Sequence, residues 1–175
     1  AFGGSFTQLT ATDLAVESAK AALAQSRMPA ETIDHVVYGN VMQSSADAAY
    51  LARHVALRAG LAESVPGLTL NRLCGSGFEA IADGARRIQT GEAKTVLVGG
   101  TENMSQAPFA LRGARFGYRM NHQSLEDTLV SGLYDSFAKM AMAETGETLA
   151  SRYGFSRADC DAYALLSHER ASKAW

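Results

Sequence analysis

Apolar residues follow a helical period at three places in the first hundred positions. Thr10 and Asp13 form a capping-box signature ahead of such a repeat, which predicts a helix that ends before Pro29. A second helix is expected over residues 48–60, where apolar and basic positions share the helical spacing. The third helix is expected after a glycine-rich turn and runs to Gly91. Its apolar residues recur at i, i+3, i+7 and i+10 and are Phe78, Ile81, Ala85 and Ile88.

Three short runs of β-branched, apolar and aromatic residues lie between these helices and predict strands. They cover residues 35–39, 67–73 and 95–100. The last run is almost continuously apolar, as expected of a strand that is covered on both faces. The βαβαβ order predicts an α/β fold with a mostly parallel sheet and helices packed on it. Three strands make an incomplete sheet, so we expect the sequence to be part of a larger protein.

The pattern changes after Met104. Residues 106–122 mix arginine, glycine and aromatic residues without periodicity, which predicts a loop-rich insertion. Helical patterns return over residues 145–153 and after Ser156, which forms a second capping-box signature with Asp159. The chain opens without an initiator methionine and closes inside a helical pattern, and we therefore expect a fragment.

Composition excludes several classes of function. The 175 residues are 47% hydrophobic and 19% charged, which is typical of a globular domain. A formal net charge of -2 gives no indication of binding to nucleic acid or to an anionic membrane. No apolar run approaches the roughly 18 residues of a membrane span. The two cysteines, Cys74 and Cys160, lack the spacing of a disulfide framework or a metal site, so no bound metal is expected.

Cys74 is the strongest candidate for chemistry. It stands where the second predicted strand gives way to the third helix, and Gly75, Ser76 and Gly77 follow it. The unpaired N–H groups and the dipole at a helix N-terminus favour a thiolate, which is the nucleophilic form of cysteine. The glycines let a substrate approach closely, and the Cys74 amide can face a developing oxyanion.

Two other interpretations of this segment stay open. A lone cysteine in a strand-to-helix turn is most often a small buried hydrophobic residue. The pattern Gly75-x-Gly77-x-x-Ala80 also has the spacing of a dinucleotide-binding fingerprint. The acidic residue expected at the end of the following strand has no good candidate, since Glu102 comes too late.

The remaining reactive residues favour structural roles. Cys160 lies one turn into the last predicted helix, where we expect it to pack. Arg112, Arg115 and Arg119 fit a solvated loop better than a phosphate site, and Met140 and Met142 are typical of core or interface positions. No histidine stands at a spacing that makes it the base for Cys74; the four are His35, His54, His122 and His168. We expect that base to come from sequence outside this chain.

Two motifs resemble the signatures of a known enzyme family. Residues 71–78 read Asn-Arg-Leu-Cys-Gly-Ser-Gly-Phe, and residues 98–109 read Val-Gly-Gly-Thr-Glu-Asn-Met-Ser-Gln-Ala-Pro-Phe. They resemble the two N-terminal signatures of the thiolases, which are acyl-CoA acyltransferases. Further matches follow in order along the chain, from Phe2-Gly-Gly-Ser to Ser156-Arg-Ala-Asp-Cys-Asp. The likeness is greatest to the 3-ketoacyl-CoA branch of fatty-acid β-oxidation.

The resemblance implies the layered αβαβα thiolase fold, built from two similar halves. Residues 1–104 would form an N-terminal half that lacks its first strand, and residues 105–175 the truncated first part of the loop domain. Carried over by position, the resemblance makes Cys74 the acyl-accepting nucleophile and its N–H one oxyanion donor. It makes Leu133 and Met142 residues that line the pocket for the acyl chain and pantetheine. It implies no metal and no resident cofactor, with coenzyme A as co-substrate.

The activity implied is acyl transfer from acyl-CoA to acetyl-CoA, reversibly, or cleavage of 3-ketoacyl-CoA by CoA through an acyl-cysteine. Acetoacetyl-CoA thiolase activity is the alternative, although such enzymes typically carry a histidine where this chain has Ala141. Gly146 and Thr148 also depart from the usual family residues.

The family's catalytic histidine, its water-binding asparagine and its second cysteine match no residue of this chain. The chain alone is therefore expected to be inactive, and a non-catalytic structural fragment is a second alternative. The resemblance further implies a homodimer or homotetramer, located in the cytoplasm of a bacterium or in the mitochondrial matrix of a eukaryote.

Overall fold

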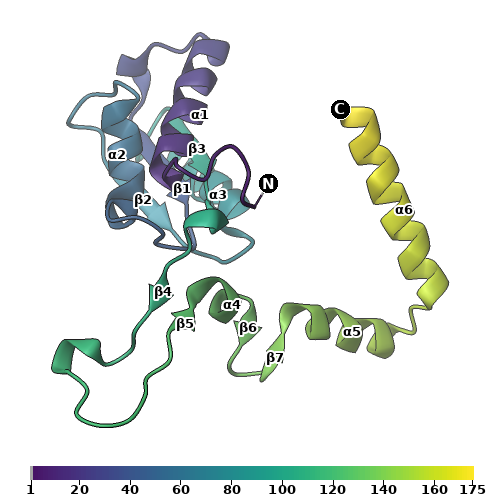
Figure 1. Ribbon diagram of the computed structural model, residues 1–175. Helices are drawn as coiled ribbons and strands as arrows, with labels where there is room; N and C mark the ends of the chain where they lie inside the picture. The colour runs from purple at the N-terminus through teal and green to yellow at the C-terminus, as the bar shows by residue number, and fades with distance from the viewer. Residues whose placement is uncertain (1) are drawn as a thin grey trace. The chain divides into compact units, whose positions relative to one another are not determined.

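The computed structural model describes residues 2–175 (Figure 1). Its contacts divide the chain into two units between Ala110 and Leu111, and each unit is described by itself. The division into residues 1–104 and 105–175 that the sequence suggests stays a prediction.

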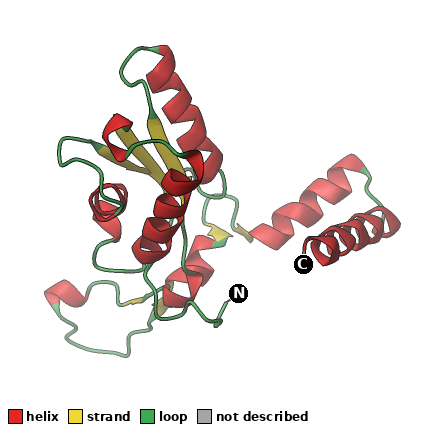
Figure 2. Cartoon of the chain, turned by 90° about the horizontal axis from the view of Figure 1, so that it is seen from above, coloured by secondary structure: helices red, strands yellow, loops and turns green. Residues whose placement is uncertain are grey.

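A three-stranded parallel sheet lies at the centre of the first unit. Its strands are β1 (His35–Gly39), β2 (Gly67–Leu70) and β3 (Val96–Gly100), in the spatial order β2-β1-β3. Figure 2 shows them side by side among the helices of this unit. The parallel βαβαβ arrangement expected from the sequence is confirmed. The predicted strand over residues 67–73 was too long, because the chain leaves the sheet after Leu70.

The sheet is covered on both faces because its side chains alternate between them. Val36 and Leu97 are register partners and join a buried cluster with the helices α1 (Ala11–Ser26) and α2 (Leu51–Arg58). The alternate strand positions point to the other face, where Val98 approaches the third helix, α3 (Ser76–Gln89), with which β1 and β3 make close contact. The first unit therefore has a helix, sheet, helix layering.

The start of α1 and the end of α2 carry the capping residues that the sequence predicts. Thr10 caps α1: its hydroxyl accepts from the Asp13 N–H at 3.0 Å, and the Asp13 carboxylate accepts from the Thr10 N–H at 2.9 Å. Gly60 follows α2 with a φ of 90°, a conformation open to glycine at little cost. The capping box and the glycine stop predicted from the sequence are confirmed.

The face of α3 that packs on the sheet consists of small residues. Ser76, Ala80 and Gly84 are its buried residues, and a Cβ on Gly84 would lie 2.7 Å from a methyl group of Val98. The large apolar residues Phe78 and Ile81 are 63% and 61% exposed. The stripe that predicted this helix is therefore not the face that the first unit buries.

The second unit has short strands and three helices and no buried residue among 111–175. Its strands are β5 (Glu126–Asp127), β6 (Tyr134–Asp135) and β7 (Met140–Ala141). Its helices are α4 (Thr128–Gly132), α5 (Met142–Tyr153) and α6 (Arg157–Ala174). α5 begins three residues earlier than the sequence predicts, and the capping box of Ser156 with Asp159 is confirmed.

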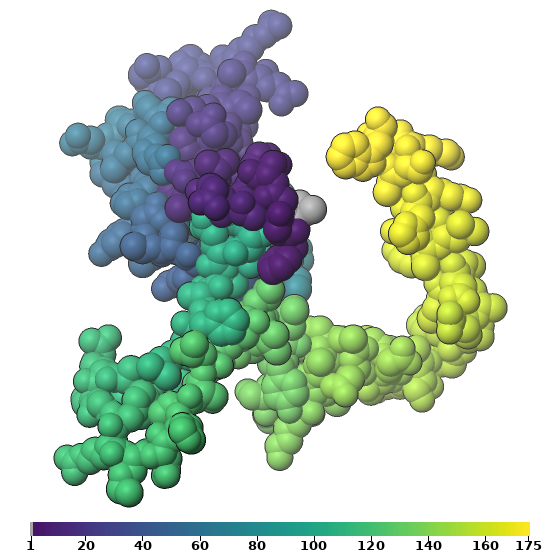
Figure 3. All heavy atoms as spheres, viewed as in Figure 1, coloured from purple at the N-terminus to yellow at the C-terminus, as the bar shows by residue number. Residues whose placement is uncertain are grey.

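Every residue of α6 is exposed, and the space-filling view shows its side chains, in yellow, projecting from a single helix (Figure 3). The expectation that Cys160 packs is therefore wrong for the described chain: its thiol is exposed, because no other element of the second unit covers this helix.

The remaining elements are short. They are the strand β4 (Phe109–Ala110) and the 3-10 turns Ala30–Thr32, Ala48–Tyr50, Met104–Gln106 and Ala114–Phe116. None of the helices in residues 2–175 combines the length and the apolar character needed to cross a membrane.

Candidate active site

Cys74 lies in a tight turn between β2 and α3. Gly75 is the N-cap residue of α3, so Cys74 lies one residue before the cap and two before Ser76, the first residue of the helix. Leu73, immediately before Cys74, has a φ of 49°, a left-handed conformation that residues other than glycine rarely adopt. The turn leaves Cys74 exposed, and its interpretation as a buried hydrophobic residue is wrong for the described chain.

The Asn71 side chain connects this turn to the segment that follows β1. Its Oδ1 accepts a hydrogen bond from the Leu73 N–H at 2.9 Å, and its Nδ2 donates to the Val41 carbonyl at 3.4 Å. The first bond supports the unusual backbone at Leu73, because a short polar side chain can bond its own backbone two residues on. The second links the turn to the segment after β1.

Ser76 closes the turn from the helix side. Its hydroxyl accepts from the Arg72 N–H at 2.9 Å and donates to the Leu73 carbonyl at 2.7 Å. Gly39, at the end of β1, lets Ser76 approach closely: a Cβ there would lie 2.8 Å from the Ser76 backbone. The start of α3 is thus pressed against the end of the central strand.

Glu102 holds the loop that follows β1. Its carboxylate accepts from the Val41 N–H at 2.9 Å, from the Met42 N–H at 3.2 Å and from the Asn40 Nδ2 at 3.0 Å. Charge-assisted bonds of this kind are stronger than neutral ones. This loop contains Val41, whose carbonyl accepts from Asn71. Glu102 therefore supports the cysteine turn indirectly, through Val41 and Asn71.

Asn103 and Thr101 fix the N-terminal segment to the end of β3. The buried Asn103 donates from Nδ2 to the carbonyls of Phe6 and Leu9, at 3.0 and 2.7 Å. The Thr101 hydroxyl donates to the Ala11 carbonyl at 2.8 Å. The second signature motif is therefore a scaffold in this chain, a role that sequence reasoning missed because its partners are backbone atoms far away in sequence.

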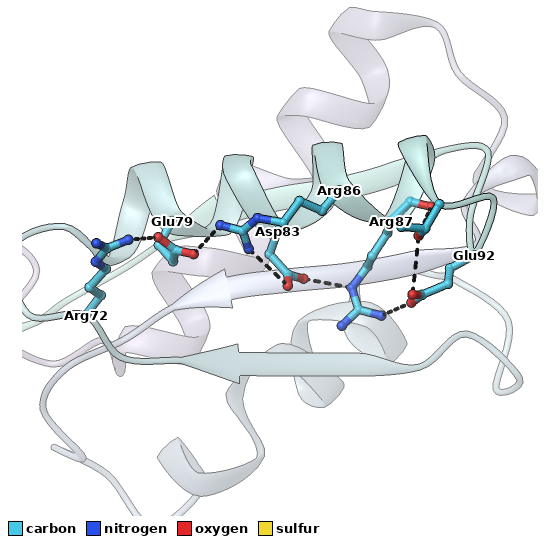
Figure 4. Close-up of polar contacts among 7 residues, drawn as sticks. Arg72, Glu79, Asp83, Arg86, Arg87 and Glu92 are labelled. Atoms are coloured by element: carbon cyan, nitrogen blue, oxygen red, sulfur yellow. Dashed lines mark hydrogen bonds and ion pairs between the residues drawn. The ribbon is translucent and has the colours of Figure 1, made fainter.

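Figure 4 shows a row of ion pairs along α3 that starts beside the cysteine turn. Glu79 accepts from Arg86 at 2.7 Å and also from Arg72, the residue at the start of the turn. The hydrogen bond from Arg86, followed by that from Arg72, holds the pKa of Glu79 below its ordinary value. The row continues at 2.7 and 3.0 Å through Asp83, Arg87 and Glu92. Exposed pairs add little stability one by one, but this row orients the Arg72 guanidinium.

No base for Cys74 appears among the described residues. His54 lies 3.8 Å from Asp47 and stacks on Tyr50, whereas His35 is part of β1, where burial lowers its pKa. No hydrogen bond in residues 2–175 joins a histidine to Cys74, and these residues contain no cluster of three metal-ligating side chains. The need for a base from outside the chain stays a prediction.

A cavity of about 180 Å³ opens beside the cysteine turn. Asn40, Val41 and Asn71 line it together with Thr69 and Leu70 of β2. Cys74 is not among the lining residues, so the thiol faces solvent outside this cavity.

The structure brings Leu133 and Met142 together in the second unit. β6 and β7 form a short antiparallel pair in which Tyr134 lies opposite Ala141. Just beyond this pair the Met142 N–H donates to the Leu133 carbonyl at 2.9 Å. Both side chains are about half exposed, at 48% and 43%. They therefore occupy adjacent positions on one hairpin, where a single ligand can touch both.

Of the three loop arginines, Arg112 has a clear structural role. Its guanidinium binds both carboxylate oxygens of Glu126, at 2.7 and 2.9 Å. This pairing lowers the pKa of Glu126 to about 2. The side chain is committed to the loop, which favours the solvated-loop interpretation over a phosphate site for this residue.

The first unit is an α/β/α layer structure with an exposed cysteine ahead of a helix, an arrangement that suits a nucleophilic thiol, and the comparisons with known proteins identify the family. The family model of the thiolase N-terminal domain matches residues 1–175. The chain belongs to the thiolase family. Membership of this family replaces the dinucleotide-binding interpretation of the glycine pattern. That interpretation required an acidic residue at the end of the following strand, whereas Glu102, which comes later, binds the loop after β1.

The relatives are longer proteins that are named as thiolases. The mitochondrial 3-ketoacyl-CoA thiolase of Rattus norvegicus is 53% identical over 171 residues, which are 97% of this chain and 43% of the relative. The beta-ketothiolase BktB of Cupriavidus necator is 40% identical, over 99% of this chain and 44% of the relative. The human mitochondrial 3-ketoacyl-CoA thiolase in complex with CoA superimposes with a TM-score of 0.96 at 50% identity, over 99% of this chain and 44% of that one. The chain thus has the thiolase fold and spans less than half the length of these relatives.

Proposed function

We propose that the protein containing this chain is a 3-ketoacyl-CoA thiolase, an acetyl-CoA C-acyltransferase with Cys74 as its nucleophile. The observation that carries the proposal is the exposed thiol of Cys74, which lies on a hydrogen-bonded turn ahead of α3. The chain is also 53% identical to a protein named 3-ketoacyl-CoA thiolase.

The reaction divides into two transfers of an acyl group. The Cys74 thiolate attacks the 3-keto carbon of the substrate, an Sγ–C3 bond forms, and the C2–C3 bond breaks. The electron pair of that bond passes to the leaving acetyl-CoA as an enolate, which takes up a proton at C2. The thiol of free CoA then loses its proton and attacks the acyl-cysteine, which releases an acyl-CoA two carbons shorter and regenerates the Cys74 thiolate. The resemblance assigns the proton-transfer groups to sequence outside this chain.

The hairpin with Leu133 and Met142 supports a pocket for the acyl chain and the pantetheine arm. Its two half-exposed apolar side chains are held next to each other by a backbone hydrogen bond. CoA acts in this proposal as a co-substrate, and the solved relative with bound CoA supports it. No resident cofactor takes part in the proposed reaction.

Mass spectrometry of the full-length protein tests the proposal. Incubation with a 3-ketoacyl-CoA in the absence of free CoA is expected to add one acyl group to the peptide that contains Cys74. Cys74→Ser should abolish the adduct, and Cys160→Ser, which removes the second exposed thiol of the chain, should leave it in place. An enzyme that turns over without an adduct on Cys74 contradicts the mechanism.

Substrate chain length separates the proposal from the acetoacetyl-CoA alternative. Ala141 leaves more room than the histidine typical of acetoacetyl-CoA enzymes, and it precedes Met142 at the proposed pocket. We expect kcat/KM to rise from four-carbon to longer 3-ketoacyl-CoA substrates. Activity confined to acetoacetyl-CoA would favour the alternative.

We also propose a homodimer or homotetramer, which sedimentation of the full-length protein tests. We further propose the mitochondrial matrix for a eukaryotic source, which the mitochondrial relative supports, and the cytoplasm for a bacterial source.

A further inference from the structure

The backbone that leads into Cys74 is bonded to one hydroxyl group, that of Ser76, which lies on the other side of the cysteine. This hydroxyl accepts from the Arg72 N–H at 2.9 Å and donates to the Leu73 carbonyl at 2.7 Å. Both partners precede Cys74 in sequence, and Ser76 itself follows it. The two bonds therefore bridge across the cysteine and close the turn around it.

The bridge holds a conformation that the chain would otherwise leave. Leu73 has a φ of 49°, and a residue with a side chain is strained in such a backbone conformation. The Leu73 carbonyl receives both the Ser76 hydroxyl and the Ser76 N–H, the latter at 3.0 Å. Without the hydroxyl, one of the two restraints on the Leu73 carbonyl is lost and the Arg72 N–H loses its acceptor.

Ser76 is itself held in place and lies away from solvent. It is 6% exposed, and its backbone and Cβ lie so close to Gly39 that a Cβ there would come within 2.8 Å of them. A hydroxyl fixed in this way can act on Cys74 only through the backbone. Residues placed next to a nucleophile by packing and hydrogen bonds set its direction of attack.

We propose that Ser76 is a positioning residue: its hydroxyl keeps Leu73 left-handed and thereby aims the Cys74 thiol at the substrate carbonyl. The inference rests on the proposed function for the identity of the substrate, but its effect on the thiol is independent of that identity.

Three variants of the full-length protein test the proposal. Ser76→Ala removes both hydroxyl bonds and keeps the Cβ that packs near Gly39. Ser76→Thr keeps the hydroxyl. Ser26→Ala is the matched control, because the Ser26 hydroxyl also accepts from a backbone N–H, that of Met28 at 3.3 Å, and donates to a carbonyl three residues earlier, that of Leu23 at 3.0 Å.

The first measurement is single-turnover acylation of Cys74 by a 3-ketoacyl-CoA. Ser76→Ala is expected to lower the rate constant at saturation by about 10- to 100-fold, as small displacements of reacting groups do. The half-saturating concentration should stay the same, because the residue does not touch substrate. Ser76→Thr should restore most of the rate, and Ser26→Ala should match the wild type. A wild-type rate in Ser76→Ala overturns the proposal.

The second measurement is alkylation by iodoacetamide, with the modification of Cys74 compared with that of Cys160 in the same molecule. Both thiols are exposed, and only Cys74 lies in the bridged turn. We expect Cys74 to react faster in the wild type and to lose this advantage in Ser76→Ala, with an unchanged thermal midpoint. If the advantage persists, or is lost only together with the thermal midpoint, the hydroxyl has no positioning role. If the wild type never acylates, but Cys74 alkylates selectively and loses that selectivity in Ser76→Ala, the proposed function fails and the inference about Ser76 stands.

Discussion

Even the single methyl group of an alanine at Gly39 should disturb the start of α3. A Cβ at this position would meet the carbonyl carbon, the carbonyl oxygen and the Cβ of Ser76, each at 2.8 Å, and a helix backbone cannot move aside easily. We expect Gly39→Ala to lower the free energy of unfolding by about 1–3 kcal/mol, as overpacking does. Gly77→Ala is the control: a Cβ there meets nothing within 4 Å, so the variant should be as stable as the wild type or more stable. Chemical denaturation measures both, and equal stabilities would contradict the prediction.

Glu126 should titrate far below an ordinary glutamate. Its two-bond pairing with Arg112 lowers its pKa from 4.5 to about 2, and the Ser131 hydroxyl contributes further. Carbon-13 NMR of the side-chain carboxyl across the acid range should find this value in the wild type. In Arg112→Gln the pKa should return towards 4.5, whereas Arg115→Gln, which changes an exposed arginine of the same loop, should have no effect. An ordinary pKa in the wild type would show that the pair does not persist in solution.

At the scale of single residues, the sequence pointed to a candidate nucleophile but not to the side chains that hold its turn. Cys74 stood out because a cysteine followed by glycines at a strand-to-helix junction is chemically unusual. Asn71, Ser76 and Glu102 did not stand out, although their side chains hold the turn. Their partners are backbone atoms, and backbone atoms leave no pattern in a sequence. Only the left-handed Leu73 shows why such support is needed.

At the scale of elements, Asp34 joins the start of β3 to the residue before β1. Its carboxylate accepts from the N–H groups of Lys94 and Thr95, at 2.6 and 3.0 Å. The bond from Thr95, then that from Lys94, lowers the pKa of Asp34 below 3.8. A lowered pKa in the folded state means that the stabilisation is complete above pH 3.8 and is lost as the pH falls through the folded value.

Asp34→Asn should therefore be less stable than the wild type at neutral pH, and the difference should shrink in acid. Thermal midpoints of both proteins between neutral and strongly acidic pH measure this, since the other carboxylates titrate in both. Glu17→Gln is the control, because Glu17 is exposed and pairs at 3.3 Å only with the exposed Lys20 on the same helix. A difference that stays constant at every pH would refute the assignment.

Element type followed from periodicity, but the face that each element buries did not. Phe78 and Ile81 predicted α3 correctly, yet the sheet packs against Ala80 and Gly84. Strand residues such as Val98 approach a helix most closely where its side chains are small, and Gly84 leaves room for that contact. The hydrophobic period measures which residues avoid water, whereas close packing depends on shape. The strand β2 was predicted too long because Leu73 was counted as part of it, whereas the chain leaves the sheet after Leu70 and Leu73 lies in the turn.

At the scale of the whole molecule, the two units differ in the buried packing that can stabilise each of them. The buried core has Val16, Val36 and Leu51 among its members and lies entirely between residues 11 and 97. Residues 111–175 include two helices of 12 and 18 residues, yet none of their side chains is buried. Isolated helices of this length are only marginally stable in water, and burial of apolar area is the main source of cooperative folding.

Separate expression of the two units should expose this difference. Residues 1–110 contain the sheet, the three helices that cover it and the whole core, so we expect a cooperative heat-capacity peak in calorimetry. Residues 111–175 should show no such peak, and their helical circular dichroism should decline gradually on heating, because there is no core whose loss can couple α5 to α6. Ile81→Lys in the first unit serves as a control for aggregation, since it removes an apolar side chain that is 61% exposed without touching the sheet. A sharp transition in residues 111–175 would show that this unit has packing beyond its helices, and a gradual one in residues 1–110 would show that the parallel sheet needs further chain to be stable.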